Sequence, residues 1–282
     1  MEGSAALHGP AAHTMGPMDH HAVHVVEGVD PRLSITRSDA GEPLDLPPIL
    51  LLHGFGSSSR QNWVETGWVR FLNDAGRSVI MVDLPAHGDS AAPEDAGAYA
   101  PSRMRADILQ ALFDERVLPL RSDVPGSGVD VVAYSLGSRL AWEFGATQPE
   151  LVRRMVLGGP GTADPLAGFD LAGAELFLAG GPASQDPTTA DLLRMAQAGP
   201  HNDLPSLLAM VSAIKTEPFD PRHAVPKMPL LLVAGDQDEY AEGITDLRDW
   251  APDARIATLP GRDHSNAITA RLFKDEALAF LA

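Results

Sequence analysis

The chain has 282 residues, 44% of them hydrophobic and 21% charged, which is the composition of an ordinary globular protein. It has no cysteine, and this excludes disulfide frameworks, thiolate metal sites, iron–sulfur clusters and cysteine nucleophiles. Its formal charge of −17 argues against nucleic-acid and membrane-surface partners, because phosphate backbones and anionic lipids are themselves negative.

The N-terminal residues 1–22 are rich in Ala, Gly, Pro and His without a sustained hydrophobic period, so we expect a loosely ordered arm. His20 and His24 would share a face if this stretch were helical, but Asp19 is the one carboxylate near them, and we expect no metal. The start lacks the basic residues and apolar core of a signal peptide, and no apolar run approaches the ~18 residues that span a bilayer. We therefore expect a cytoplasmic protein.

Short apolar runs then recur along the chain. Val23 to Glu27 and Leu33 to Arg37 flank a Gly-Val-Asp-Pro turn at 28–31 and predict an antiparallel hairpin. Six further runs follow: Pro48 to Leu52, Val79 to Asp83, Val129 to Tyr134, Met155 to Gly158, Leu230 to Ala234 and Ile256 to Leu259. Continuous apolar runs separated by helical stretches are typical of strands covered on both faces, so the pattern predicts an α/β fold with a mostly parallel sheet.

The helices between these runs are marked by caps and by apolar spacing. Ser102 is a candidate N-cap for a helix that carries Met104, Ile108 and Leu112 at helical spacing and that stops before Pro119. A further helix is predicted from about Leu136 to Gln148, and a last one runs through Phe273 and Phe280. The alternation breaks over residues 161–225, where short apolar helices punctuated by Gly-Pro pairs predict an insertion.

The strongest local signal is the run Val131-Val132-Ala133-Tyr134-Ser135-Leu136-Gly137, in which a strand leads directly into a serine and then a helix. A sharp strand-to-helix turn requires small residues two positions before and after the serine, and Ala133 and Gly137 meet this requirement. The helix N-terminus would stabilise negative charge that develops at the hydroxyl. Ser135 is thus a candidate nucleophile, and the alternative is a simple helix N-cap.

A serine nucleophile needs a base, and the base needs an acid that orients it. One buried strand ends in Gly235-Asp236-Gln237-Asp238 and the next ends in Gly261-Arg262-Asp263-His264. Because the carboxyl ends of parallel strands lie on one side of a sheet, Ser135, Asp238 and His264 should converge there. Each could instead cap a helix, and Asp236 or Asp164 could replace Asp238 as the acid. Four other histidines are weaker base candidates, His53, His87, His201 and His223.

The fourth requirement is a pair of donors for the tetrahedral oxyanion. A flexible Gly54-Phe55-Gly56 turn follows a buried strand, so the backbone N–H of Phe55, together with that of Leu136, would form the oxyanion hole. The turn also partly mimics a dinucleotide fingerprint with Asp83 as its acid, but Ser59 stands where the third glycine belongs, and we expect no cofactor.

Five segments together resemble the α/β-hydrolase family: His53 to Gly56, Asp83 to Ser90, the turn around Ser135, Gly235 to Asp238 and Gly261 to His264. They cover residues 23–282 in the chain order Ser, Asp, His. The resemblance implies an α/β-hydrolase fold with a mostly parallel eight-stranded sheet, a core of 23–160 and 226–282, and a helical cap of 161–225 after the sixth strand. It also implies that Asp238 is the acid. Ala133 departs from the glycine usual at its position.

The serine at this turn argues against hydrolases that open epoxides or carbon–halogen bonds, because those need a carboxylate there. The sequence predicts a serine carboxylesterase that forms an acyl-enzyme at Ser135, resolved by water that His264 activates. Its partner would be a small-molecule acyl substrate, uncharged and modestly hydrophobic. Thioesterase, lactonase, amidase, C–C hydrolase, perhydrolase and cofactor-free haloperoxidase activities use the same residues and stay open, as does a non-catalytic ligand-binding role. The oligomeric state is not predicted.

Overall fold

The computed structural model describes residues 22–25 and 33–282. The predicted N-terminal arm up to residue 21, with His20, lies outside these ranges, and so does the predicted turn at 28–31. In the described ranges, no cluster of three or more His, Asp or Glu side chains is arranged to hold a metal ion. None of the helices in those same ranges has the length and apolar character needed to cross a membrane.

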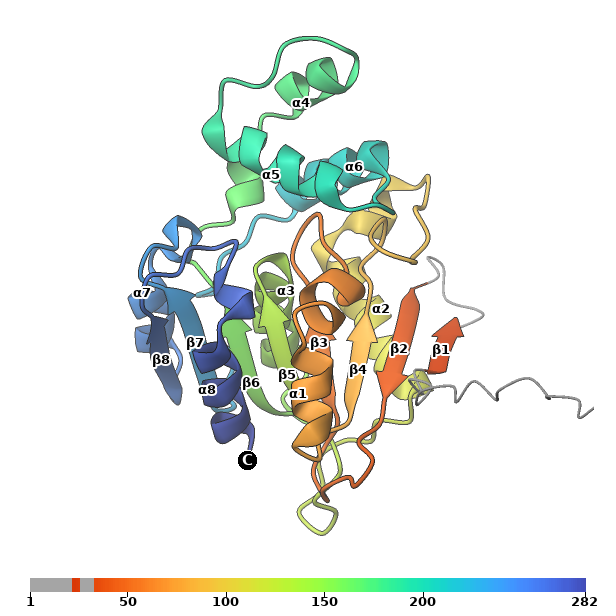
Figure 1. Cartoon of the computed structure of the whole chain (residues 1–282), viewed down its shortest axis with the longest axis vertical. Helices are drawn as coiled ribbons and strands as arrows, with labels where there is room; N and C mark the ends of the chain where they lie inside the picture. Colours follow the sequence, from red (N-terminus) through yellow and green to blue (C-terminus); the bar gives the residue numbers. More distant parts are fainter. Residues whose placement is uncertain (1–21, 26–32) are drawn as a thin grey trace, which may run out of the picture.

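Eight strands form one sheet in the order β1-β2-β4-β3-β5-β6-β7-β8 (Figure 1). They are β1 (Ala22–Val25), β2 (Ser34–Ser38), β3 (Ile49–Leu52), β4 (Val79–Val82), β5 (Val129–Tyr134), β6 (Val152–Gly158), β7 (Leu230–Gly235) and β8 (Ala254–Leu259). β1 and β2 pair antiparallel, β2 runs antiparallel to β4, and every later pairing is parallel. The predicted mostly parallel sheet with an N-terminal antiparallel pair is confirmed.

Helices cover both faces of the sheet, which explains the continuous apolar strands. In β3, Leu50 and Leu52 pack into one core cluster, whereas Ile49 and Leu51 pack into the other. The first cluster lies under α2 and α3 and the second under α1 and α8 (Figure 1). The bounds of the core helices are α1 (Trp68–Asp74), α2 (Pro101–Asp114), α3 (Leu136–Thr147), α7 (Ile244–Trp250) and α8 (Arg271–Leu281). Short turns of helix complete the core at η1 (Arg60–Val64), η2 (Ala96–Tyr99), η4 (Glu239–Ala241) and η5 (Ala267–Thr269).

The predicted cap at Ser102 is wrong. The N-cap of helix α2 is Ala100, and Pro101 is the first helical residue. The fixed φ and missing N–H of proline suit this first position. The Ser102 backbone N–H and hydroxyl both donate to the carboxylate of Glu217 instead, at 2.8 and 2.7 Å. These two hydrogen bonds join the start of α2 to Glu217, which lies between β6 and β7 in the chain.

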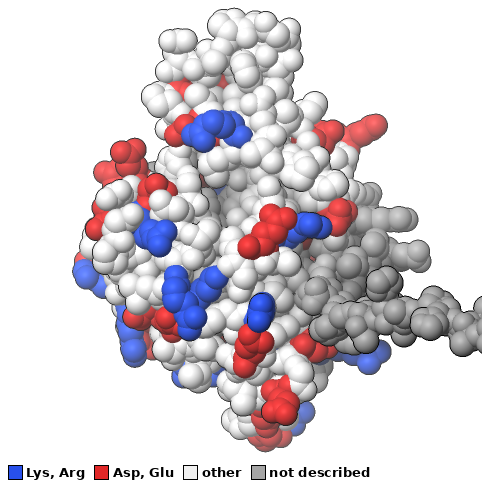
Figure 2. Space-filling model, viewed as in Figure 1, with Lys and Arg blue, Asp and Glu red and all other residues white. Residues whose placement is uncertain are grey.

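Three helices and a short turn of helix lie between β6 and β7, where the insertion was predicted: η3 (Pro165–Gly168), α4 (Leu171–Leu178), α5 (Pro187–Ala198) and α6 (Leu204–Thr216). Each of the three helices begins after an aspartate, Asp170, Asp186 or Asp203, whose side chain accepts a hydrogen bond from the N–H three residues later. The helices lie above the carboxyl ends of the parallel strands (Figure 1). On the face shown in Figure 2, the α4 end of this insertion displays little charge.

Candidate active site

Ser135 occupies a strained turn between β5 and α3. Its φ of 54° lies in the left-handed region, which non-glycine residues seldom adopt. The turn is closely packed, because a Cβ on Gly137 would collide with the Leu52 carbonyl and lie 2.7 Å from that of His53. Ala133, the other small residue of the turn, is fully buried. The Ser135 side chain makes no cap hydrogen bond to α3, so the alternative role as an N-cap does not describe it.

Ser135, His264 and Asp238 form a continuous hydrogen-bonded chain. The Oγ of Ser135 lies 2.8 Å from His264 Nε2, and His264 Nδ1 lies 2.9 Å from both carboxylate oxygens of Asp238. A carboxylate only accepts, so Nδ1 carries the proton in this arrangement and Nε2 is the acceptor for the serine hydroxyl. The Tyr134 hydroxyl donates to the backbone carbonyl of His264 at 2.6 Å, and the His264 ring makes a T-shaped contact with the ring of Tyr240.

The structure separates the three candidate acids. Asp238 faces His264 and also accepts from the Tyr240 N–H, so it caps η4 and orients the imidazole at once. Asp236 accepts from the Gly261 N–H at 2.7 Å and shapes the loop before His264. Asp164 caps η3 and forms a buried ion pair with Arg139.

Gly159 is part of this site although no sequence signal marked it. It follows β6 with a φ of +60°, and a Cβ there would lie 2.7 Å from His264 Cε1 and 3.3 Å from Asp238 Oδ2. The absence of a side chain therefore lets the His264 imidazole pack closely against the backbone of Gly159.

Both predicted oxyanion donors lie beside Ser135. A Cβ on Gly54 would lie 3.2 Å from Ser135 Cβ, which places the Gly54-Phe55-Gly56 turn directly against the serine. Among residues 22–25 and 33–282, the backbone N–H groups of Phe55 and Leu136 have no hydrogen-bond acceptor. Two free donors beside a serine hydroxyl are the arrangement that an oxyanion requires.

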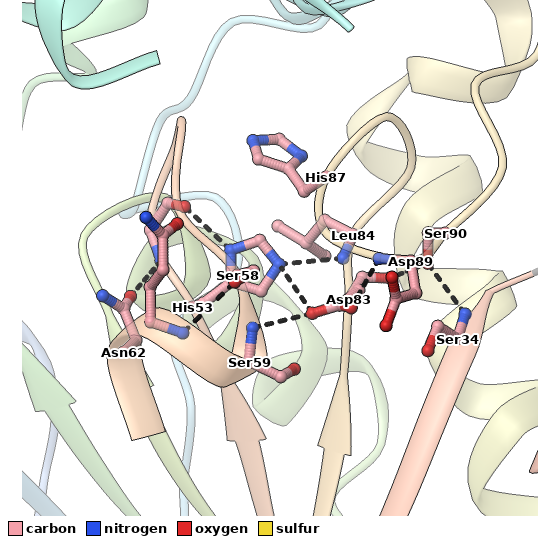
Figure 3. A network of polar contacts seen from close by, with 12 residues as sticks. Ser34, His53, Ser58, Ser59, Asn62, Asp83, Leu84, His87, Asp89 and Ser90 are labelled. Atoms are coloured by element: carbon pink, nitrogen blue, oxygen red, sulfur yellow. Dashed lines mark hydrogen bonds and ion pairs between the residues drawn. The ribbon is translucent and has the colours of Figure 1, made fainter. Parts of the chain in front are cut away.

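Two buried imidazoles hold this turn in place. His53 Nδ1 donates to the Gly54 carbonyl at 2.8 Å while its Nε2 accepts from the Leu84 N–H (Figure 3). His87 Nε2 accepts from the Gly56 N–H at 3.0 Å. Burial lowers the pKa of His53 to about 4 and, with a further contribution from the nearby His53, that of His87 to about 3, so both rings are neutral.

Asp83 and Asn62 complete the network around the turn. Asp83 accepts from the backbone N–H groups of Ser59 and Asp89, at 2.7 and 3.0 Å (Figure 3). Asn62 Oδ1 accepts from the Gly54 N–H at 2.9 Å. The carboxylate that resembled the acid of a dinucleotide fingerprint thus binds the protein's own backbone.

Two pockets meet at Ser135, and both are lined by Phe55, Ser135 and His264. The insertion pocket, about 600 Å³ counted to its open mouth, lies under α5 and is lined largely by apolar side chains, among them Trp142, Leu157, Leu166, Leu192, Phe219 and Leu247. The loop pocket, about 660 Å³, is more polar and is lined by Ser57, Gln61, Asn62, Met195 and Ser265, among others.

The comparison with protein families agrees with this geometry. The family model described as alpha/beta hydrolase fold matches residues 47–191, which is about half of the chain. The chain belongs to the alpha/beta hydrolase family. The sequence resemblance to this family and the predicted α/β-hydrolase fold with a mostly parallel sheet are therefore confirmed.

Individual members of the family resemble the chain over part or all of its length. It is 32% identical to an esterase of Mycobacterium tuberculosis over 39% of this chain and 32% of the relative. It is 29% identical to the 2-hydroxy-6-oxononadienedioate/2-hydroxy-6-oxononatrienedioate hydrolase of Burkholderia vietnamiensis over 65% of this chain and 58% of the relative. Among solved structures, the enol-lactonase of Burkholderia xenovorans has a TM-score of 0.67 at 20% identity, over 92% of this chain and 99% of that one.

These curated relatives are matched over only part of their own length. The chain covers between 32% and 58% of the two described above. The relatives and the structural neighbour described above are named an esterase, a hydrolase and an enol-lactonase.

Proposed function

We propose that the protein is a serine hydrolase that cleaves a carboxylic ester through an acyl-enzyme. The observation that carries the proposal is the chain of hydrogen bonds from Ser135 through His264 to Asp238 at the meeting point of the two pockets. This arrangement supplies a nucleophile, a base within hydrogen-bond reach and an acid that fixes the tautomer of the base.

The chemistry follows from the positions of these atoms. As Ser135 Oγ attacks the ester carbonyl carbon, His264 Nε2 takes its proton and Asp238 stabilises the imidazolium that forms. The oxyanion would accept hydrogen bonds from the N–H groups of Phe55 and Leu136. When the tetrahedral intermediate collapses, the imidazolium protonates the departing alcohol and the acyl group stays on Ser135. His264 then deprotonates a water molecule, which attacks the acyl carbon and releases the acid.

The insertion pocket favours an uncharged substrate group. Its one arginine, Arg139, is neutralised by the buried carboxylate of Asp164, and its other lining residues are largely apolar. The relative from Burkholderia vietnamiensis is named for dioate substrates, which carry two carboxylates. A pocket whose guanidinium is already paired suits such an anion less well than a neutral acyl chain. We propose that the insertion acts as a cap that forms the roof of this pocket.

Labelling with a fluorophosphonate probe tests the nucleophile. We expect the wild-type protein and Ser138→Ala to be labelled and Ser135→Ala not to be. Ser138 is a suitable control because it lines the same pocket but donates to the Gly158 carbonyl at 2.8 Å. No labelling of the wild-type protein, or equal labelling of all three, would refute the proposal.

A series of nitrophenyl esters tests the substrate class. For neutral acyl chains of two to eight carbons, we expect kcat/KM to rise with length until the insertion pocket is filled, at up to about tenfold for each two buried methylenes. A matched series with a terminal carboxylate should be poorer at every length. Preference for the anionic series would show that the Arg139–Asp164 pair does not set the charge of the pocket.

A further inference from the structure

The insertion makes a specific polar contact with the turn that carries the oxyanion donor. Asn202 lies in the turn between α5 and α6, and its Nδ2 donates to the Gly56 carbonyl at 2.7 Å and to the Ala196 carbonyl at 2.9 Å. Gly56 is adjacent to Phe55, whose N–H is the proposed donor. One side-chain amide thus joins the insertion to the Gly54-Phe55-Gly56 turn.

Two glycines make this contact possible. A Cβ on Gly56 would lie 2.8 Å from Ala196 Cα, so the backbone of α5 rests directly on the turn. A Cβ on Gly199 would overlap the Asn202 amide and lie 3.0 Å from the Gly56 carbonyl oxygen. Space for the Asn202 side chain is therefore provided from both sides, by the turn and by the insertion.

The contact also completes the hydrogen bonding of the two residues that flank Phe55. Three of their four backbone groups are bound without the insertion: Asn62 accepts from the Gly54 N–H, His53 and the Ser57 N–H donate to the Gly54 carbonyl, and His87 accepts from the Gly56 N–H. The Gly56 carbonyl is the remaining group, and its partner comes from the insertion. Gly56 has a φ of +69°, and a glycine samples many conformations when its carbonyl is released.

We propose that Asn202 is a positioning residue that holds the Phe55 N–H in the oxyanion hole by fixing the Gly56 carbonyl from the insertion. The inference rests on the proposed function. It also makes the oxyanion hole depend on docking of the insertion, whereas the Ser135–His264–Asp238 hydrogen bonds involve no residue of 161–225. Displacing the insertion would then weaken stabilisation of the oxyanion and leave the nucleophile and base in place.

Two variants test this in different ways. Asn202→Ala removes the amide, whereas Gly199→Ala keeps it but pushes it out of place, at a backbone conformation (φ −76°, ψ 115°) that alanine tolerates. We expect each to lower kcat about tenfold with little change in KM, a smaller loss than the ~10²–10³-fold seen when an oxyanion donor itself is deleted. Gln185→Ala is the matched control, because it removes an exposed amide of the same insertion that donates to the Ala183 carbonyl at 3.4 Å.

Binding of a trifluoromethyl ketone, which forms a tetrahedral adduct, should weaken in parallel with kcat/KM in both variants and stay unchanged in Gln185→Ala. The double variant Gly199→Ala/Asn202→Ala should lose little more than Asn202→Ala alone, because both changes remove one contact. If the thermal midpoint falls but kcat and ketone affinity do not, Asn202 only docks the insertion and the inference is overturned. Absence of fluorophosphonate labelling in the wild-type protein would instead overturn the proposed function, and the inference with it.

Discussion

The two imidazoles that support the Gly54-Phe55-Gly56 turn should make the protein sensitive to mild acid. His53 and His87 are fully buried, and burial lowers their pKa values from 6.5 to about 4 and about 3. In the unfolded chain both rings regain the ordinary value. Between pH 6.5 and the folded values, the unfolded chain therefore binds two protons that the folded chain excludes, and stability falls as the pH falls through this window.

The size of the effect follows from the width of the window. Each pH unit below 6.5 costs about 1.4 kcal/mol for each imidazole as long as the folded ring stays neutral. At pH 5, both rings together should have lowered the free energy of unfolding by about 4 kcal/mol relative to neutral pH. This is a large share of the ~5–15 kcal/mol that stabilises a typical domain. The loss attributable to His53 levels off near pH 4 and that of His87 near pH 3.

Urea unfolding at several pH values between 7 and 4.5, followed by tryptophan fluorescence, measures this directly. In His87→Gln, one titrating ring is removed, so the decrease in unfolding free energy between pH 7 and 5 should be about 2 kcal/mol smaller than in the wild-type protein. His223→Gln is the control for the substitution itself, because the His223 side chain is 85% exposed and lies outside the buried network around the turn. Identical pH dependence in the wild-type protein and His87→Gln would refute the reasoning, whatever their stabilities at pH 7.

Three further predictions concern single side chains. Asp238→Asn should lower kcat for ester hydrolysis by about 10³–10⁴-fold, because it removes the acceptor that fixes the His264 tautomer. Asp236→Asn should change kcat less than tenfold. Equal losses in the two variants would contradict the assignment of Asp238 as the acid. Gly159→Ala should reduce kcat about 10²-fold by displacing the His264 ring by roughly 1 Å, and an unchanged rate would show that the ring has room to move. Asp130→Asn should lower the free energy of unfolding, measured in urea, by about 3–5 kcal/mol, because it leaves the buried Arg77 without the charge of its partner.

Much of the fold was predictable because strands of a sheet that helices cover on both faces have continuous apolar sequences. The start of β6 was missed by three residues, since Arg153 and Arg154 interrupt its apolar run. In the structure Arg153 reaches back to Asp130 of the neighbouring strand at 2.6 Å, and Arg154 binds carbonyls at the C-terminus. Partners so distant in sequence cannot be inferred from a local pattern, so the apolar run alone places the start of this strand at Met155.

The residues of the hydrogen-bonded chain were predictable for a topological reason. Ser135, Asp238 and His264 each follow a parallel strand, and the carboxyl ends of such strands lie on one edge of the sheet. Which of Asp236 and Asp238 orients the imidazole depends on which side chain points toward His264. The Asp236 carboxylate points elsewhere, because it accepts a hydrogen bond from the Gly261 N–H. Gly159 and Asn202 carried no signal, because their roles depend on proximity to His264 and to Gly56 respectively, each more than 100 positions away.

Burial explains why one histidine near the serine is suited to proton transfer and two others are not. His53 and His87 have no exposed surface, and both nitrogens of each ring are bound to backbone groups of the protein. A base must become protonated during the reaction. For a buried ring whose pKa lies at about 4 or below, protonation near neutral pH costs too much free energy. His264 lines both pockets and has a carboxylate on Nδ1, so a positive charge on its ring is compensated where it forms. The same residue type therefore supports the Gly54-Phe55-Gly56 turn in its neutral form and, at His264, is placed to act as a base in the proposed mechanism, where a counter-charge is present.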